Sequence, residues 1–305
     1  MTRRGWVLFG LLGVIWGLPY LMIKVAVGGV SVPMVVFVRT AIGAAVLLPL
    51  ALGRIDWGVL RKHWLMILAF AGTEILVPWY LLSDAERHLS SSMTGLLIAC
   101  VPTVGALLAT VGGERLSGVR WVGLAVGLGG VALLAAPNLG GGDAWAIIEV
   151  LLVAVGYAVA PVIAARKLQE IPGLVLVTVS LGIAAIAYLP AAIVTWPSRM
   201  PSQDVLWALG GLAVVCTAVA LLAFFELIRE VGPSKAVVIT YVNPLVAVAA
   251  GVLILNESLS TTTIVAFVLI LGGSVLATFR ERAAKLSAVA VLPDQEVTHS
   301  ARRNA

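Results

Sequence analysis

One acidic residue lies deep inside a long apolar run of the sequence. Glu74 is ten residues from the start of the run at 64–82, which is roughly 15 Å along a helix that rises 1.5 Å per residue. A carboxylate at that depth in a hydrocarbon core is costly, and such acids face a bundle interior or a water-filled cavity. Two interpretations stay open: Glu74 carries a proton or contacts a cation, or it is a neutral, hydrogen-bonded structural acid. Trp79 and Tyr80 do not share its helix face and are interpreted as an outer aromatic belt.

Prolines interrupt several of the apolar runs near their middle. Pro78 lies four residues after Glu74 and lacks the N–H that would bond to the Glu74 carbonyl, so a kink is expected there. Comparable mid-span prolines are Pro19, Pro102, Pro161 and Pro244. We predict a helix break at each of these prolines, with a freed backbone carbonyl beside it.

Polar and basic side chains share one side of the first apolar run. Trp16, Tyr20 and Lys24 recur every four residues, which places them at successive turns of a helix. They either wall a polar cavity or are an interfacial Tyr with a Lys that snorkels to the membrane surface. Arg39 lies six residues past a proline in the next run, roughly 9 Å deep. A role at the lipid interface and a role in binding or ion pairing both stay open for Arg39.

Two further polar residues stand beside the predicted breaks. Tyr157 precedes Pro161 by four residues, and Asn243 directly precedes Pro244. Asn243 either hydrogen-bonds a bound molecule or joins neighbouring helices, which is the commoner use of Asn in a membrane. Together with Trp16, Tyr20 and Glu74, these are the residues that we expect to line a polar site.

The composition indicates which elements must hold these side chains. Of the 305 residues, 61% are hydrophobic and 11% are charged, and the mean hydropathy is +1.07; this balance is far from that of a soluble protein. Short charged or Gly/Pro-rich joints separate ten apolar runs long enough to cross a membrane as helices. The runs are 6–27, 33–52, 64–82, 90–111, 118–136, 144–164, 174–195, 205–228, 234–255 and 261–280.

Two stretches of the sequence repeat at an offset of 143, namely ERLSGVRWVGLAVGLGGVAL at 114–133 and ESLSTTTIVAFVLILGGSVL at 257–276. Each half of the chain contains five runs, an odd number, so the halves must enter the membrane with opposite orientations. The predicted fold class is therefore an all-α polytopic membrane protein of ten transmembrane helices, arranged as a 5+5 inverted repeat. The predicted domains are a first repeat at 1–136, a linker at 137–143, a second repeat at 144–282 and a disordered cytoplasmic tail at 283–305.

The two repeated stretches also contain structural signals. Glu114 and Glu257 each precede a helix-capping Ser by three residues, but inverted topology places them on opposite sides of the membrane. They are therefore interpreted as matched structural joints, not as one acid pair. Gly123 and Gly127 form a GxxxG face for close helix approach.

The distribution of Lys and Arg predicts the orientation of the chain. With the N-terminus inside, the cytoplasmic segments contain sixteen of these residues, and the opposite side contains only Arg87 and Arg199. Since cytoplasmic loops carry the excess of positive charge, we predict a multi-pass protein of the cell (inner) membrane with both termini cytoplasmic. The net charge of +5 then reflects topology and contact with anionic membrane lipids, and no nucleic-acid partner is expected.

Residues for catalysis or metal binding are sparse. The three histidines, His63, His88 and His299, fall in joints or in the tail, and there is only one deep acid. Intramembrane acid–base catalysis and a metal site would each need several such groups together. Cys100 and Cys216 lie within apolar runs, as inert buried thiols do. We therefore expect no enzyme activity, no metal and no cofactor.

Several motifs together resemble a known transporter family. They are GGERLSGVRWVG before the fifth run, LNESLSTTT before the tenth, Trp16 with Gly17, and VGPSKAVVITYVNPLVAV at 231–248. With the 5+5 plan they look like the EamA family of the drug/metabolite transporter superfamily, over about residues 6 to 280. The resemblance implies export of amino acids or other small metabolites through a central cavity. Small multidrug members place an essential acid in their first helix; this chain has none there, so Glu74 would have to substitute.

The sequence therefore predicts a secondary transporter that exports a small metabolite, an amino acid or a related amphipathic compound, by alternating access. Glu74 is the candidate for coupling to protons, and the substrate-binding candidates are Trp16, Tyr20, Glu74, Tyr157 and Asn243. A facilitative uniporter and a multidrug efflux protein are alternatives within the same class. An intramembrane enzyme and a non-transporting receptor are the rivals from other classes.

Overall fold

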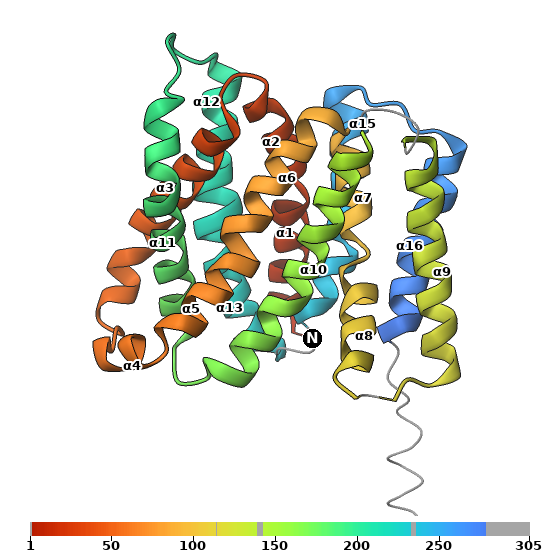
Figure 1. Cartoon of the computed structure of the whole chain (residues 1–305), viewed down its shortest axis with the longest axis horizontal. Helices are drawn as coiled ribbons and strands as arrows, with labels where there is room; N and C mark the ends of the chain where they lie inside the picture. The colour runs from red at the N-terminus through yellow and green to blue at the C-terminus, as the bar shows by residue number, and fades with distance from the viewer. Residues whose placement is uncertain (1, 114, 139–142, 233–235, 279–305) are drawn as a thin grey trace, which may run out of the picture.

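The structure, a computed structural model, describes residues 2–113, 115–138, 143–232 and 236–278. In these ranges every regular element is a helix, and Figure 1 shows the long helices running side by side in one bundle. Nine helices of the described chain are long and apolar enough to cross a membrane, and a shorter apolar helix at Ile239–Leu255 makes the tenth. The predicted all-α membrane bundle is confirmed. Glu114, the predicted tail at 283–305 and most of the predicted linker lie outside the described residues.

The first half of the chain makes five crossings of the bundle. Its elements are α1 (Arg3–Gly17) and α2 (Pro19–Val27); α3 (Val32–Leu52); α5 (Trp64–Ala71), the π-helical turn η1 (Gly72–Leu76) and α6 (Val77–His88); α7 (Ser91–Ile98) and α8 (Val101–Val111); and α9 (Gly118–Ala135). A short helix, α4 (Trp57–Lys62), lies between the second and third crossings, and the 3-10 turn η2 (Ala136–Asn138) follows the fifth.

The second half repeats this plan. Its elements are α10 (Ala144–Lys167); α11 (Gly173–Val194); α12 (Gln203–Gly210), the π-helical segment η3 (Gly211–Val219) and α13 (Ala220–Val231); the 3-10 turn η4 (Val237–Tyr241) and α15 (Asn243–Leu255); and α16 (Thr261–Thr278). The third crossing of each half thus contains a π-helical segment, and the fourth crossing of each half is interrupted.

Corresponding helices of the two halves pack against each other. The second crossings α3 and α11 form one pair, the fourth crossings α7 and α15 another, and the fifth crossings α9 and α16 a third. The first and third crossings exchange partners, because α1 packs on α13 while α6 packs on α10. This reciprocal pairing is what a 5+5 inverted repeat requires, and it spreads the interface between the halves through the whole bundle.

The helix interruptions coincide with most of the mid-span prolines. Pro19 begins α2 after a break at Leu18, Pro102 is the second residue of α8, and Pro244 is the second residue of α15. Pro161 differs, because it lies inside the continuous helix α10 with its side chain on an exposed face. The break expected at Pro161 is therefore absent from α10: the apolar helix continues on both sides of one missing hydrogen bond.

Glycines allow α9 and α16 to approach closely. A Cβ atom on Gly130 would lie 2.8 Å from the backbone nitrogen of Ile270, and one on Gly273 would overlap the backbone of Gly127. Beside this contact the hydroxyl of Ser274 donates to the carbonyl of Ala99, 2.9 Å away. The close approach expected from the GxxxG face is thus found, and its partner is the glycine pair of the second repeat.

A carboxylate of the second half caps a helix of the first half. The two oxygens of Glu257 accept hydrogen bonds from the backbone N–H groups of Ser91 (2.7 Å) and Ser92 (2.9 Å), at the N-terminus of α7. Asn256, in the left-handed conformation with φ 55°, turns the chain toward that position. The contact lies at the end of the bundle opposite the N-terminus (Figure 1). Glu257 is therefore a structural joint, as expected, but one that connects the two halves.

Replacing Gly130 with Leu is expected to destabilise the protein by about 1–3 kcal/mol, because the added side chain forces α9 and α16 apart. The neighbouring Gly129→Leu is the matched control, since nothing lies within 4 Å of a Cβ placed on Gly129. Thermal unfolding of both variants in the same detergent measures the difference. Equal midpoints for the two variants would contradict this account of the interface.

The Glu257 contact predicts a pH dependence of stability. Partial burial alone would raise the pKa of Glu257, but the hydrogen bonds from Ser92 and Ser91 outweigh it and hold the pKa below the ordinary value of 4.5. Folding thus favours the charged form, so the contribution is complete above pH 4.5 and is lost as the pH falls through the lower pKa of the folded state.

Glu257→Gln should therefore lower the unfolding free energy by about 1 kcal/mol at neutral pH, the usual cost of a lost helix cap. The gap between wild type and variant should close in acid, as followed by thermal unfolding between neutral pH and about pH 3. Glu170→Gln is the control, because the Lys62–Glu170 ion pair (2.9 Å) is exposed and contributes little. A constant gap at every pH would argue against an ionised cap.

Candidate functional site

The third crossing changes its helical geometry at its single deep acid. Residues Gly72–Leu76 form a π turn around Glu74, and α6 begins directly afterwards with Val77 and Pro78. The kink expected from Pro78 thus takes the form of a widened turn that contains Glu74. The second half has its π-helical segment at Gly211–Val219, which includes the position 143 residues beyond Glu74, Thr217. Such segments inside membrane helices often accompany functional sites.

The Glu74 carboxyl has no hydrogen-bond or ion-pair partner in the described part of the chain. Its side chain is half-buried, and among the described residues it makes no hydrogen bond and no ion pair. Gly156 brings α10 close to it, because a Cβ there would lie 2.5 Å from the carbonyl oxygen of Thr73. The next residue of α10, Tyr157, lies within electrostatic range of Glu74. The close approach of α10 therefore places a phenol beside a carboxyl that has no other partner in the described chain.

Arg39 is buried in the same region. It is 7% exposed, its Nε donates to the Thr217 hydroxyl at 3.0 Å, and its guanidinium carbon lies 3.6 Å from the centre of the Trp79 ring. The Thr217 hydroxyl itself donates to the carbonyl of Leu212, five residues earlier, so the π segment orients it as the acceptor for Arg39. A position of Arg39 at the lipid interface is excluded. The interpretation of Trp79 as outer belt is corrected, because its ring stacks on a buried cation.

Tyr20 completes the group. It is 8% exposed and lies within electrostatic range of both Tyr157 and Arg39. We call the following side chains the central polar cluster; they come from α2, α3, η1, α6, α10 and η3, and so from both halves of the chain. The cluster consists of Tyr20, Arg39, Glu74, Trp79, Tyr157 and Thr217.

The other two predicted substrate-binding residues, Trp16 and Asn243, make no described contact with a member of this cluster. The ring of Trp16 packs on Phe224 with centroids 4.8 Å apart, in an apolar contact between α1 and α13. Asn243 begins α15, and its side-chain oxygen is buried without a hydrogen-bond partner in the described residues. The structure therefore brings Tyr20, Glu74 and Tyr157 together, while the Trp16 ring packs on Phe224 and the Asn243 side-chain oxygen makes no hydrogen bond to a described residue.

The end of the bundle opposite the N-terminus contains a second group of charges. Lys24 donates from Nζ to the carbonyls of Glu86 (2.6 Å) and Leu89 (2.7 Å), so it binds the C-terminus of α6 and does not snorkel to lipid. The carboxylate of Glu86 is fully buried, and neither oxygen has a hydrogen-bond partner among the described residues.

Sequence reasoning missed Glu86, because the charged stretch at 83–89 suggested a loop. The helix in fact continues to His88. The signal was present: Leu82, Ala85, Glu86 and Leu89 are spaced as one helix face, and all four are buried.

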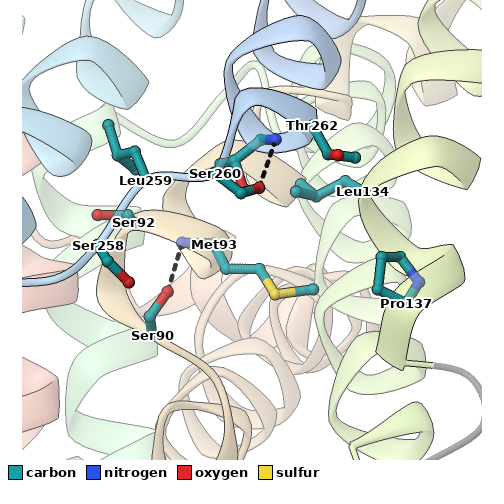
Figure 2. Close-up of a pocket in the computed structure, with 10 residues that line it drawn as sticks. Ser90, Ser92, Met93, Leu134, Pro137, Ser258, Leu259, Ser260 and Thr262 are labelled. Atoms are coloured by element: carbon teal, nitrogen blue, oxygen red, sulfur yellow. Dashed lines mark hydrogen bonds between the residues drawn. The ribbon is translucent and has the colours of Figure 1, made fainter.

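A hydroxyl-rich pocket of about 360 Å³ opens near this end of the bundle. Figure 2 shows Ser90, Ser92 and Met93 of the α7 terminus facing Ser258, Ser260 and Thr262 from the other half, with Leu134 and Pro137 on the far side. The dashed bonds in the figure are helix caps, one from the Met93 N–H to the Ser90 hydroxyl at 3.1 Å. The pocket contains no member of the central polar cluster, so it is a separate feature.

Comparison with known proteins agrees with this architecture. The curated inner membrane transporter YedA of Escherichia coli K12, named as uncharacterized, is 27% identical over 260 residues, which is 81% of each chain. The uncharacterized transporter YvbV of Bacillus subtilis strain 168 is 24% identical over 93% of this chain and 94% of its own. One solved crystal structure is 21% identical and superposes with a TM-score of 0.64 over 91% of this chain and 98% of that one, which shows a shared fold.

A family model settles the relationship. The model of the EamA-like transporter family matches the chain twice, at residues 4–136 and 144–279, and the gap between the two matches coincides with the connection between the inverted halves. The two matches cover nearly all of the described bundle, including every member of the central polar cluster. The chain is a multi-pass membrane transporter that belongs to the EamA-like transporter family.

Proposed function

We propose that this protein is a secondary transporter that exports a small metabolite from the cell by alternating access and couples export to protons through Glu74. One observation carries the proposal: a carboxyl with no partner among the described residues lies at a π turn, in a cluster built from both halves of an inverted repeat. Ionisable groups at membrane depth that face a bundle interior commonly serve in proton relays and binding sites.

Contacts between the halves at both ends of the bundle support the alternating movement. At the N-terminal end, Arg4 pairs with Glu226 at 2.6 Å, and Lys62 pairs with Glu170 at 2.9 Å. At the opposite end, the Glu257 carboxylate caps α7. Each contact joins the first half to the second. Rocking of one half against the other would break the contacts at one end while those at the other end persist, so that the cluster opens to one side at a time.

The neighbours of Glu74 also favour transport over catalysis. Among the described residues no group of three or more His, Cys, Asp or Glu side chains is placed to hold a metal ion. Among the described groups that act electrostatically on Tyr157 and Arg39 there is no histidine, and Glu74 is the one carboxyl, so these two residues have no acid–base pair beside them. Transport of an unchanged molecule requires only binding and movement, both of which this arrangement supports.

Glu74→Gln should abolish the effect of a pH gradient on transport and slow gradient-driven transport roughly tenfold or more, because the amide carries no proton. The measurement is movement of radiolabelled amino acids and cationic drugs in proteoliposomes, at imposed gradients between about pH 5.5 and 8.

Asp204→Asn, a carboxyl-to-amide change at an exposed residue that makes no ion pair in the described chain, is the control and should leave transport unchanged. Gradient-dependent transport that survives Glu74→Gln would remove Glu74 from the mechanism. If transport by the wild type is also independent of the pH gradient, the protein is a facilitative uniporter. If only cationic drugs are transported, it is a multidrug efflux protein.

We also propose that both termini lie in the cytoplasm, as the distribution of Lys and Arg predicts. Arg61 and Arg199 are exposed at opposite ends of the bundle. A membrane-impermeant maleimide should label Arg199→Cys in intact cells and Arg61→Cys only after lysis. The native thiols of Cys100 and Cys216 are buried, so the unchanged protein is the negative control. The reverse labelling pattern would invert the orientation.

A further inference from the structure

The central polar cluster contains a cation that has no counter-ion in the described chain. Arg39 is buried at the middle of the bundle, and none of the ion pairs among the described residues includes it. A guanidinium remains charged at any physiological pH, and charged groups at membrane depth pair with one another, with carbonyls or with a ligand. We propose that Arg39 binds the anionic group of the transported molecule and that this group is a single carboxylate. The inference rests on the proposed transport function and specifies the substrate class.

The contacts of Arg39 leave one edge of the guanidinium free. Trp79 covers a face of the guanidinium plane at 3.6 Å, and Nε donates to Thr217. The terminal N–H groups make no hydrogen bond to any described residue. They are also not among the fully buried side-chain atoms that lack a hydrogen-bond partner. This is the edge that binds a carboxylate through two parallel hydrogen bonds.

The surroundings of Arg39 do not neutralise its charge. The groups that act on it electrostatically are Tyr157, Cys216 and Tyr20, whose phenols and thiol are neutral at physiological pH. Glu74 lies within electrostatic range of Tyr157, but no ion pair in the described chain joins Glu74 to Arg39, so the deep acid is not its counter-ion. Stacking on Trp79 and one hydroxyl are weaker compensation than an anion. A bound carboxylate would supply the counter-ion that Arg39 lacks in the described chain.

The same geometry selects the kind of anion. The cluster contains a single cation, whereas a phosphate dianion is usually held by several cationic or N–H donors. Glu74 lies within electrostatic range of the same Tyr157 as Arg39 does, and in its ionised form it would repel a second negative charge on the molecule. Tyr20 and Trp79 add aromatic surface beside the cation. A molecule with one carboxylate and an otherwise neutral or cationic body matches all three features.

Arg39 also connects the two halves through its hydrogen bond to Thr217, from α3 of the first half to η3 of the second. A carboxylate on the free edge of Arg39 therefore lies where the halves meet, which is the position that alternating access requires of a substrate.

The test uses the purified full chain in detergent and a panel of acids, each paired with its primary amide: L-leucine, L-threonine, L-phenylalanine and 4-methylpentanoate, with phosphate and sulfate added. Thermal stabilisation and quenching of tryptophan fluorescence report binding, since Trp79 lies against the guanidinium. At least one acid should bind with an affinity at least tenfold above that of its amide. The acid–amide comparison needs no variant, so it decides the proposal even where a variant fails to fold.

Variants then assign the binding to Arg39. Arg39→Gln should abolish the preference for the acid over the amide, and Arg39→Lys should reduce it about tenfold, because an ammonium keeps the charge but loses the planar fork. The exposed Arg54→Gln is the control and should behave as wild type. Equal binding of acids and amides, retention of the preference in a folded Arg39→Gln protein, or binding of phosphate or sulfate alone would overturn the proposal. The proposal is also overturned if no acid in the panel binds.

Transport in sealed vesicles separates this inference from the proposed function. An acid that binds through Arg39 yet never crosses the vesicle membrane would refute transport while confirming the binding site. Transport that discriminates neither acid from amide nor wild type from Arg39→Gln would refute the site while leaving transport intact.

Discussion

The cost of placing charge among apolar helices determines how the interior of this bundle is arranged. The two deep cations lie against specific groups: Arg39 contacts an aromatic face and a hydroxyl, and Lys24 binds the carbonyls that end α6. The helices must approach closely for these contacts to form, and Gly43 of α3 is one residue that permits it, since a Cβ there would lie 3.0 Å from Cγ2 of Thr217. Glu74 and Glu86 keep carboxylate oxygens that no described residue satisfies. These two carboxyl groups are therefore the places in the bundle where binding a ligand or a proton costs the least free energy.

The framework could be predicted from the sequence because its signals are local and repeated. Hydropathy gives the crossings, and the odd number of crossings in each half gives the inversion. The GxxxG face of Gly123 and Gly127 predicts a close helix approach, for which the structure supplies α16 as the partner, and depth along the run identifies Glu74. The family could also be recognised, since its motifs lie at helix joints whose capping chemistry leaves a clear pattern.

The partners of the charged side chains could not be predicted from spacing along one helix. Arg39 meets Thr217 and Trp79 from two other crossings, and only the assembled bundle excludes a position of Arg39 at the lipid surface. Glu86 was missed because a charged stretch near a membrane surface suggests a loop, although helix periodicity contained the correct signal. The spacing of Trp16 and Tyr20 along one helix could not reveal that the Trp16 ring packs on Phe224 of α13.

The inverted repeat preserves the framework of the two halves but not their charges. Glu74 corresponds to Thr217, and Arg39 corresponds to Ser180, whose buried hydroxyl has no hydrogen-bond partner among the described residues. Two identical inverted halves would present the same chemistry to both faces of the membrane, and the protein would be unchanged by turning it over. Because the cation and the carboxyl of the central polar cluster, Arg39 and Glu74, both belong to the first half, the two faces of the protein are chemically distinct, and the protein has a built-in polarity across the membrane.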